Sequence, residues 1–219
     1  ANSINVARWL PQQFYYFFAY QQWKFKNEPP VIAVPSGNFG NICAGLVAYR
    51  SGLPVKHFIA ACNANDVVPA YFQKGEYKAQ PAKATISNAM DVGDPSNFVR
   101  MLELFDHQFG TLKQLISSYS ISDEETRQII VEVKNKYNYL PDPHGAVAYA
   151  SVKRYLAEHE SEKAIFLETA HPIKFYDVVE PLINETIPLP ASVKEVVDKE
   201  KSSVKIAGDY NELKHFLLQ

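Results

Sequence analysis

Residues 31–52 read Val-Ile-Ala-Val-Pro-Ser-Gly-Asn-Phe-Gly-Asn-Ile-Cys-Ala-Gly-Leu-Val-Ala-Tyr-Arg-Ser-Gly, a pattern that predicts a buried strand, a tight turn and a helix. Gly37 and Gly40 in the turn permit backbone angles and close approaches that a side chain would prevent. The first amides of the helix have no carbonyl to bind within it, and the helix dipole makes this end positive. We therefore expect an anion such as phosphate to bind here. The alternative is an ordinary strand–turn–helix that binds nothing, because glycine motifs also occur without a ligand.

Apolar runs at 57–61 and 164–167 extend the alternation of strand and helix that begins at 31–34. Because one helix separates the short runs at 31–34 and 57–61, they predict a βαβ unit with parallel strands. A third strand is expected at 164–167, after a helix that begins near His144. The predicted fold class is α/β, with an open, mostly parallel sheet flanked by helices. Ligands of such sheets bind at the carboxyl ends of the strands.

Most of the remaining chain is predicted to be helical. Apolar residues in 3–23 recur at three- and four-residue spacing, and Pro11 interrupts them, so we expect a kinked helix whose aromatic side chains are buried. Ser122 opens a capping box, and Asp209 marks the start of a further helix. Residues 188–192 are expected to form a linker.

Composition excludes several classes of function. The 219 residues include 22 basic and 24 acidic side chains that are well mixed, so we expect no nucleic-acid partner. Cys43 and Cys62 lie in apolar patterns without metal-ligand spacing, which favours buried free thiols, no metal and a cytoplasmic location. No apolar run reaches the roughly 18 residues that a membrane helix needs, so no membrane association is expected.

Four stretches of the chain resemble, in order and spacing, motifs of the threonine synthases, which are pyridoxal-phosphate enzymes. The stretches are Ser-Gly-Asn-Phe-Gly-Asn at 36–41, Asn-Ala-Met-Asp-Val-Gly-Asp-Pro-Ser-Asn-Phe-Val-Arg at 88–100, Asp-Pro-His-Gly-Ala-Val at 142–147 and Thr-Ala-His-Pro-Ile-Lys-Phe at 169–175. With the opening Asn-Ser-Ile-Asn, the resemblance covers most of residues 2–175. It implies the tryptophan synthase β-like fold, in which the cofactor lies between two domains.

The resemblance also implies how this segment relates to a whole enzyme. Residues 1–219 are expected to be the C-terminal, cofactor-phosphate-binding portion of a larger two-domain protein, since they begin without a methionine. In the family, the lysine that binds the cofactor covalently lies in the N-terminal half, within a Ser-Phe-Lys-Asp-like segment that this sequence lacks. Lys24 follows a predicted helix end and is not taken as that lysine. We therefore assign no catalytic residue to this chain.

The resemblance implies a site for pyridoxal 5'-phosphate. Its phosphate is expected to bind the backbone amides of five consecutive residues: Gly37, Asn38, Phe39, Gly40 and Asn41. The unpaired amides and the positive dipole at the start of the helix also favour phosphate binding at this turn. Thr169 is expected to place its hydroxyl at the pyridine nitrogen of the cofactor. The alternative for Thr169 is that it only ends a strand or caps the next turn.

A second anion site is expected at the start of the chain. A helix start supplies amides and the guanidinium of Arg8 can hold two phosphate oxygens. The resemblance implies that Ser3 and Arg8, with Asn38, bind the phosphate of the substrate O-phosphohomoserine. The alternative is that Asn2 or Ser3 only caps a helix and that Arg8 is a surface charge.

The implied reaction is the conversion of O-phospho-L-homoserine and water to L-threonine and phosphate, by a carbon–oxygen lyase that acts on a small molecule. The isolated segment is expected to be inactive. One alternative is a serine or threonine dehydratase of the same fold, against which Ser3 and Arg8 argue, because its substrate has no phosphate. Another is a non-catalytic phosphate-binding α/β module. The sequence indicates no oligomeric state.

Other motif residues receive no catalytic role. We expect Asp142 to cap a helix, and His144 and His171 to pack or form hydrogen bonds. Lys174 has no assigned role. The 88–100 motif either shapes a loop over the substrate or simply opens a helix at Pro95-Ser96-Asn97, and both interpretations remain open.

Overall fold

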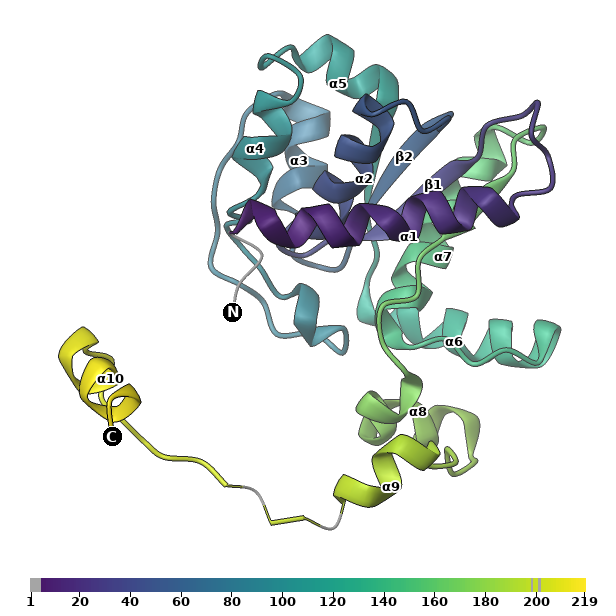
Figure 1. The fold of residues 1–219 in the computed structure, drawn as a ribbon. Helices are drawn as coiled ribbons and strands as arrows, with labels where there is room; N and C mark the ends of the chain where they lie inside the picture. Colours follow the sequence, from purple (N-terminus) through teal and green to yellow (C-terminus); the bar gives the residue numbers. More distant parts are fainter. Residues whose placement is uncertain (1–4, 198, 201) are drawn as a thin grey trace. The chain divides into compact units, whose positions relative to one another are not determined.

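A computed structural model describes residues 5–197, 199–200 and 202–219. The chain divides into two units, and the boundary along the sequence lies between Ile187 and Pro188. The first unit contains the sheet and the helices that cover it (Figure 1). The second unit contains two of the described helices, α9 (Ala191–Val197) and α10 (Tyr210–Leu217). The linker predicted at 188–192 is therefore shorter than expected, since α9 begins at Ala191.

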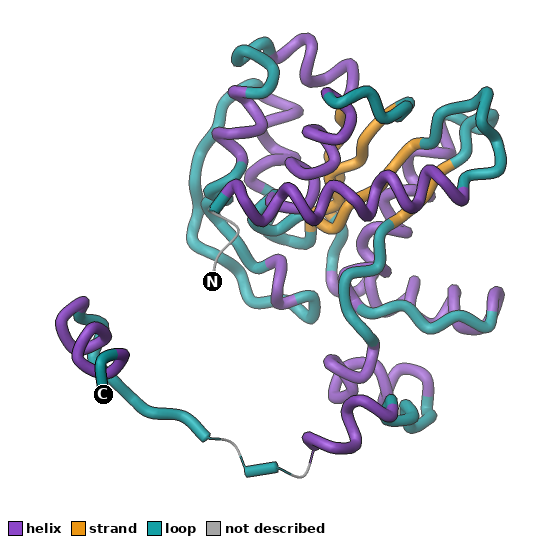
Figure 2. The backbone as a smooth tube through the Cα atoms, viewed as in Figure 1, coloured by secondary structure: helices purple, strands orange, loops and turns teal. Residues whose placement is uncertain are grey.

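Within the described residues, the sheet has four parallel strands in the order β3-β2-β1-β4. They are β1 (Val31–Pro35), β2 (His57–Cys62), β3 (Ile116–Ser120) and β4 (Ala164–Phe166). Figure 2 shows strands in orange with helices around them. The α/β class and the three predicted strands are confirmed, with ends within one residue of those expected. The strand β3 was not predicted, because its sequence Ile-Ser-Ser-Tyr-Ser has only one fully buried residue and little apolar signal.

Helices cover both faces of the sheet. The described residues of the first unit form η1 (Val6–Arg8), α1 (Trp9–Gln22), α2 (Gly40–Arg50), α3 (Val67–Lys74), η2 (Asn88–Met90), α4 (Phe98–Glu103), α5 (Phe109–Leu115), α6 (Asp123–Tyr137), α7 (Pro143–Glu158), η3 (Pro172–Phe175) and α8 (Tyr176–Ile183). The capping box at Ser122 and the cap at Asp209 are both present as predicted. In the part of the chain that the structure describes, no helix combines the length and apolar character needed to cross a bilayer.

The strands divide the core into two clusters. Ile32 and Val34 of β1 point into a cluster that α1 to α5 cover, whereas Val31 and Ala33 point into a second cluster with α6, α7 and α8. This alternation follows from the two-residue period of a strand. Burial of both faces is what a parallel sheet requires, and every residue of β1 and β2 is buried, most of them apolar.

The first long helix differs from its prediction. A short 3₁₀ turn over Val6–Arg8 precedes α1, and Pro11 lies in the first turn of α1. A proline is tolerated there because the amide that it lacks would have no partner in the helix. The helix then continues to Gln22 as one element, so Pro11 does not divide it. The predicted kink stays a prediction.

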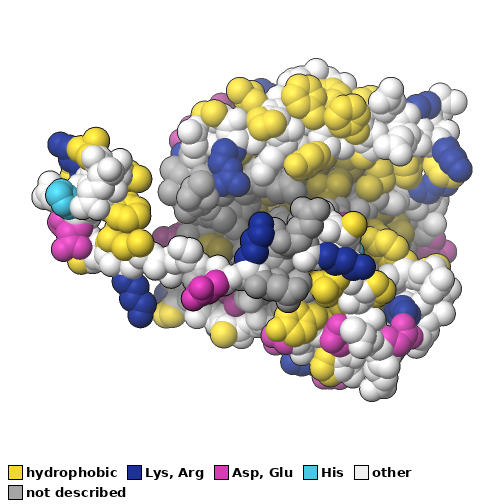
Figure 3. Space-filling view, turned by 60° about the horizontal axis from the view of Figure 1, so that its bottom comes forward, with side chains coloured by type: hydrophobic (Ala, Val, Ile, Leu, Met, Phe, Trp, Pro, Cys, Tyr) yellow, Lys and Arg dark blue, Asp and Glu magenta, His cyan; other side chains and the backbone are white. Residues whose placement is uncertain are grey.

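The expected burial of the aromatic residues of α1 is wrong. Trp9 and Tyr16 are buried, whereas four apolar side chains of the same helix are 54–60% exposed: Leu10, Phe14, Tyr15 and Phe18. The helix packs on the sheet side through one narrow face, because Tyr16 lies directly over Gly45 of α2. Hydrophobic side chains reach the surface in several places (Figure 3), and the outer face of α1 contributes some of them.

Candidate functional site

The turn between β1 and α2 has the geometry of an anion site. Phe39 is the residue before the helix, and the first helical hydrogen bond runs from the Cys43 amide to the Phe39 carbonyl, at 3.1 Å. The amides of Gly40, Asn41 and Ile42 precede that bond, so the helix offers them no carbonyl. These donors and the positive end of the helix dipole lie just beyond the carboxyl end of β1.

The turn achieves its shape differently from the prediction. Among the residues described, the positive φ in this turn belongs to Phe39, at 62°, and not to Gly37 or Gly40. The Phe39 ring is buried and makes an edge contact with Phe98, with 6.0 Å between ring centroids. This packing holds a bulky residue in a conformation that it rarely adopts, as is common at functional sites. The expected close approach is present at Gly37, where a Cβ would lie 2.6 Å from the Met90 Cα.

The loop before α4 holds Asn38 in place. The amide and hydroxyl of Ser96 donate to Asn38 Oδ1 at 2.7 and 2.9 Å, and Asn97 Nδ2 donates to the Asn38 carbonyl at 2.9 Å. Asn97 Oδ1 in turn accepts a hydrogen bond from Arg100 Nη1 at 2.9 Å. Asn97 precedes α4, which confirms that this motif opens a helix, and its neighbours also support the turn. The interpretation that the motif shapes a loop over the substrate stays a prediction.

A polar network holds the segment that faces this turn. Asp91 Oδ1 accepts hydrogen bonds from Asn63 Nδ2 at 2.8 Å and from Thr85 Oγ1 at 2.7 Å, and Asp91 Oδ2 accepts one from the Thr85 amide at 2.9 Å. The same segment carries Ala89 and Met90. Asp91 therefore acts on the site through the backbone that it fixes.

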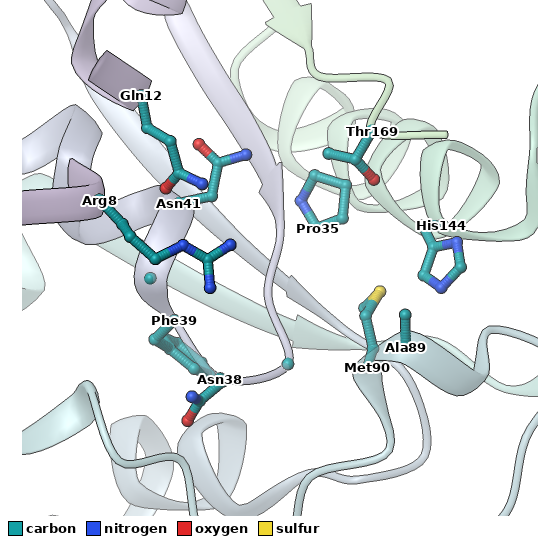
Figure 4. Close-up of a pocket in the computed structure, with 12 residues that line it drawn as sticks. Arg8, Gln12, Pro35, Asn38, Phe39, Asn41, Ala89, Met90, His144 and Thr169 are labelled. Atoms are coloured by element: carbon teal, nitrogen blue, oxygen red, sulfur yellow. The ribbon is translucent and has the colours of Figure 1, made fainter. Parts of the chain in front are cut away.

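A pocket of about 670 Å³ lies where these segments meet (Figure 4). The residues that line it are Arg8, Gln12, Pro35, Gly37, Asn38, Phe39, Gly40, Asn41, Ala89, Met90, His144 and Thr169. In Figure 4 the Arg8 guanidinium points towards the turn, while Thr169 and His144 lie across the pocket from it. The structure thus brings together all the predicted cofactor-binding residues with Arg8. Ser3 and Asn2 lie outside the described residues.

Arg8 and Thr169 are both exposed, and their positions follow from the chain topology. Arg8 ends the 3₁₀ turn that leads into α1, and Asn5 caps that turn by accepting a hydrogen bond from the Ala7 amide at 2.9 Å. Thr169 lies three residues beyond β4, at the same edge of the sheet as the turn after β1. The pairing of β4 with β1 brings the two segments together.

Sequence reasoning missed part of the pocket wall. Gln12 lies one helical turn beyond Arg8, so helical spacing could have placed it beside Arg8. Pro35 ends β1, so its position at the carboxyl end of a strand could have indicated that it lines the pocket. Glu168 does not line the pocket, but its contact with the first turn of α7 was also missed, because a single acidic residue after an apolar strand has no distinctive pattern.

The buried Asp142 and His144 and the half-buried Glu168 form a polar cluster beside the pocket. Asp142 caps α7, and its Oδ1 accepts hydrogen bonds from the His144 amide at 2.8 Å and from His144 Nδ1 at 2.5 Å. Burial acts to raise the pKa of Asp142, but the hydrogen bonds from His144 lower it below its usual value. Burial, followed by the interaction with the neighbouring Asp142 carboxyl group, raises the pKa of Glu168 to about 9. The predicted cap at Asp142 and hydrogen bonding of His144 are confirmed.

The other predicted polar residues have structural roles. His171 Nδ1 accepts a hydrogen bond from the Ile173 amide at 3.1 Å, and this caps η3 as expected. Cys43 and Cys62 are buried free thiols, as predicted, and burial raises the pKa of each to about 12. Among the described side chains, no group of three or more His, Cys, Asp or Glu is arranged to hold a metal ion.

Comparison with known proteins identifies the family. Residues 4–169 match the family described as pyridoxal-phosphate dependent enzyme, and residues 145–217 match the one described as threonine synthase, C-terminal. Threonine synthase of Haemophilus influenzae is 43% identical over 220 residues, which cover 100% of this chain and 51% of that protein. The chain therefore spans about half the length of the curated relatives it matches.

Solved structures show the same relationship. The crystal structure of threonine synthase from Escherichia coli matches with a TM-score of 0.89 and 41% identity, over 99% of this chain and 50% of that one. Pyridoxal-phosphate-bound threonine synthase from Brucella melitensis matches with a TM-score of 0.86 and 29% identity, over 99% and 52%. These matches confirm the tryptophan synthase β-like fold. The chain belongs to the family of pyridoxal-phosphate dependent enzymes, and its resemblance to the C-terminal part of threonine synthases is confirmed.

Proposed function

We propose that this pocket binds the phosphate of pyridoxal phosphate and the phosphate of O-phospho-L-homoserine, in a protein that converts the latter and water to L-threonine and phosphate. The observation that carries the proposal is the meeting of Arg8 with the α2 N-terminus in one pocket. The Arg8 guanidinium and the positive end of the α2 dipole come from separate segments of the chain, and both favour binding of a phosphate.

The chemistry of the lining residues fits an anionic ligand. None of the described residues that line the pocket is acidic, and one of them is an arginine. A volume of about 670 Å³ lies within the range typical of small-molecule sites. The amides of residues 37–41 are the donors proposed for the cofactor phosphate, because backbone donors of this kind can approach phosphate oxygens closely.

Thr169 is proposed to face the ring nitrogen of the cofactor. When bound, pyridoxal phosphate supplies an electron sink for charge that develops on the substrate. A hydroxyl does not hold the ring nitrogen protonated as a carboxylate would, so Thr169 favours the weaker, neutral form of that sink. Control of the reaction then depends more strongly on how the pocket positions the substrate.

Arg8 and Asn38 are proposed to hold the substrate phosphate. The guanidinium can donate two parallel hydrogen bonds to phosphate oxygens, which orients as well as binds the group. Asn38 is oriented by Ser96 and Asn97, so its position is set before the substrate arrives. Ser3 remains a predicted third ligand.

No lysine is among the described residues that line the pocket. Lys24 follows Trp23, the C-cap residue of α1, and does not contribute to the wall. We therefore propose that the lysine that binds the cofactor lies outside this segment, and that the 219 residues alone form no threonine. Threonine formation by the purified segment would contradict this part of the proposal.

The test compares Arg8→Met with Arg50→Met, which removes an exposed arginine at the end of α2. Hydrogen bonds to charged groups contribute about 1.5–3 kcal/mol, so Arg8→Met should weaken binding of inorganic phosphate by roughly 10- to 100-fold. Titration of the segment with phosphate at constant ionic strength measures this change. Arg50→Met should bind like the parent, and equal binding by all three proteins would contradict the proposed site.

The substrate is tested in the full-length protein that carries this segment. We expect release of threonine and phosphate from O-phosphohomoserine, with a raised KM in Arg8→Met. A dehydratase would instead release ammonia and a 2-oxo acid from serine or threonine. Deamination as the main activity would therefore replace the proposed function with that alternative.

A further inference from the structure

Three buried polar atoms of one cluster beside the pocket have no hydrogen-bond partner within the part of the chain that the structure describes. They are Asp142 Oδ2, His144 Nε2 and Glu168 Oε1. Such atoms are costly to bury, and each calls for an explanation. All three belong to the cluster at the N-terminus of α7, so one arrangement of protons can account for the two carboxyl oxygens and can fix which nitrogen of His144 carries its proton.

Glu168 reaches this cluster because residue 145 is a glycine. A Cβ on Gly145 would lie 2.0 Å from Glu168 Oε1 and 2.5 Å from Glu168 Oε2. The carboxyl group of Glu168 therefore occupies the space above the first turn of α7 that a side chain would fill. The same turn begins with Asp142, so the two carboxyl groups share one buried site.

Two carboxylates cannot both remain ionised in such a site, because like charges in a buried environment repel strongly. Asp142 has three reasons to keep its charge. Its Oδ1 accepts two hydrogen bonds from His144, and it lies at the positive end of a helix dipole. Glu168 has no comparable donors among the hydrogen bonds that the structure records, so the proton belongs on Glu168.

We propose that Glu168 is a protonated acid that donates its hydrogen to Asp142 Oδ2, and that the ionised Asp142 thereby fixes His144 with its proton on Nδ1. In the neutral ring, Nε2 is then a hydrogen-bond acceptor on a residue that lines the pocket (Figure 4). One proton on Glu168 satisfies both orphaned carboxyl oxygens. Glu168 is a positioning residue in this scheme, since it acts on the pocket through Asp142 and His144.

The electrostatics of the surrounding groups agree with this arrangement. The raised pKa of Glu168, about 9, leaves it protonated at neutral pH, while the lowered pKa of Asp142 leaves that residue ionised. Besides His144, the titratable Tyr139 in the segment before α7 also faces the pair, and burial and the two acids raise its pKa. From η3, Phe175 packs on the His144 ring, with 4.9 Å between centroids.

The first test follows the Glu168 carboxyl group in the whole 219-residue chain by NMR with side-chain ¹³C-labelled glutamate. Its carboxyl resonance, assigned by its absence in Glu168→Gln, should titrate with a midpoint near pH 9. Glu160→Gln, which changes an exposed glutamate, should leave that resonance in place. A midpoint near the ordinary value of 4.5 would overturn the proposal.

The second test reads the proton on His144 directly. Long-range ¹H–¹⁵N correlations distinguish the two ring nitrogens, and we expect Nδ1 to carry the proton in the neutral ring. Glu168→Gln should keep this form, because its amide still donates to Asp142. A neutral ring protonated mainly on Nε2 in the parent would overturn the proposal.

A third measurement links the two acids. Asp142→Asn removes the negative charge, so the midpoint of Glu168 should fall well below that of the parent. An unchanged midpoint would show that Asp142 does not hold the proton on Glu168, and would overturn the proposal. Because Asp142 also caps α7, this variant risks unfolding, and in that case the two measurements on the parent decide the question. None of these measurements requires a cofactor, so their outcome is independent of the proposed function.

Discussion

Substitution of Gly45 by alanine tests how closely α1 and α2 pack beside the pocket. A Cβ on Gly45 would lie 2.6 Å from both Cε1 and Cζ of Tyr16 and 2.9 Å from its hydroxyl oxygen. Carbon atoms in favourable contact are about 3.5–4.0 Å apart, so the ring would have to retreat by about 1 Å. Tyr16 is completely buried, so the ring cannot move without displacing α1 or its neighbours.

The magnitude follows from three opposing effects. Overpacking of this kind costs about 1–3 kcal/mol. Movement of the ring also weakens the hydrogen bond that the Tyr16 hydroxyl donates to the Asn41 carbonyl at 2.8 Å, at a cost of about 0.5–1.5 kcal/mol. Alanine is the better helix former by about 1 kcal/mol, which offsets part of the loss. We expect a net loss of about 0.5–3.5 kcal/mol in the free energy of unfolding.

Urea denaturation followed by tryptophan fluorescence measures this loss. The matched control is Gly110→Ala in α5, where an added Cβ meets nothing within 4 Å, so the better helix former should raise stability by up to about 1 kcal/mol. Since α1 also carries Gln12 into the pocket, Gly45→Ala should weaken phosphate binding as well. If Gly45→Ala were as stable as Gly110→Ala, the close packing of the two helices would be refuted.

Four other changes have defined outcomes. Gly37→Ala should weaken phosphate binding and lower the free energy of unfolding by about 1–3 kcal/mol, because its Cβ would meet the backbone of Met90. Phosphate titration and urea denaturation measure these changes, and unchanged values would show that Gly37 does not lie against Met90. The folded-state pKa of Glu168 is raised from 4.5 to about 9, so its contribution to stability is complete below pH 4.5 and is lost as pH rises through 9. Glu168→Gln should remove this fall of the unfolding free energy with pH, which amounts to no more than about 1 kcal/mol per pH unit after solvent screening. If the unfolding free energies of parent and variant changed in parallel between pH 5 and 8, this prediction would be contradicted. Ser122→Ala should lower stability by about 1 kcal/mol through loss of the capping box, and an unchanged urea midpoint would count against that cap. Phe14→Gln combined with Phe18→Gln should change stability by less than about 0.5 kcal/mol per residue, because both side chains are mostly exposed; a larger loss in urea would mean that this face is buried.

The part of the site that lies within one stretch of sequence was predictable. The apolar run at β1, the glycines and asparagines of the turn, and the start of α2 are local signals, and the structure contains these elements in that order. The caps at Ser122 and Asp142 were predictable for the same reason, since a cap involves residues two or three apart in the chain. The details of the turn were not, because burial of the Phe39 ring decides which residue takes the positive φ.

Elements with weak local signals depended on their neighbours. The strand β3 forms because it pairs with β2 at the edge of the sheet, although its own residues are mostly polar. On α1 the reverse holds, since a strongly apolar pattern predicted burial, yet only the side of the helix towards Gly45 is covered. Hydrophobic spacing indicates that a face is apolar, but it does not indicate what covers that face.

The sequence by itself determined the α/β class, the strand–turn–helix that is proposed to bind an anion, and the family, because strand runs, helix starts and motifs are patterns of neighbouring residues. Only the tertiary structure decided that Arg8 and Thr169 line the same pocket as the turn at 37–41. It also placed Glu168 against Asp142 over Gly145. These contacts join residues that are far apart in the chain, and they arise from sheet order and helix packing, which no local pattern encodes.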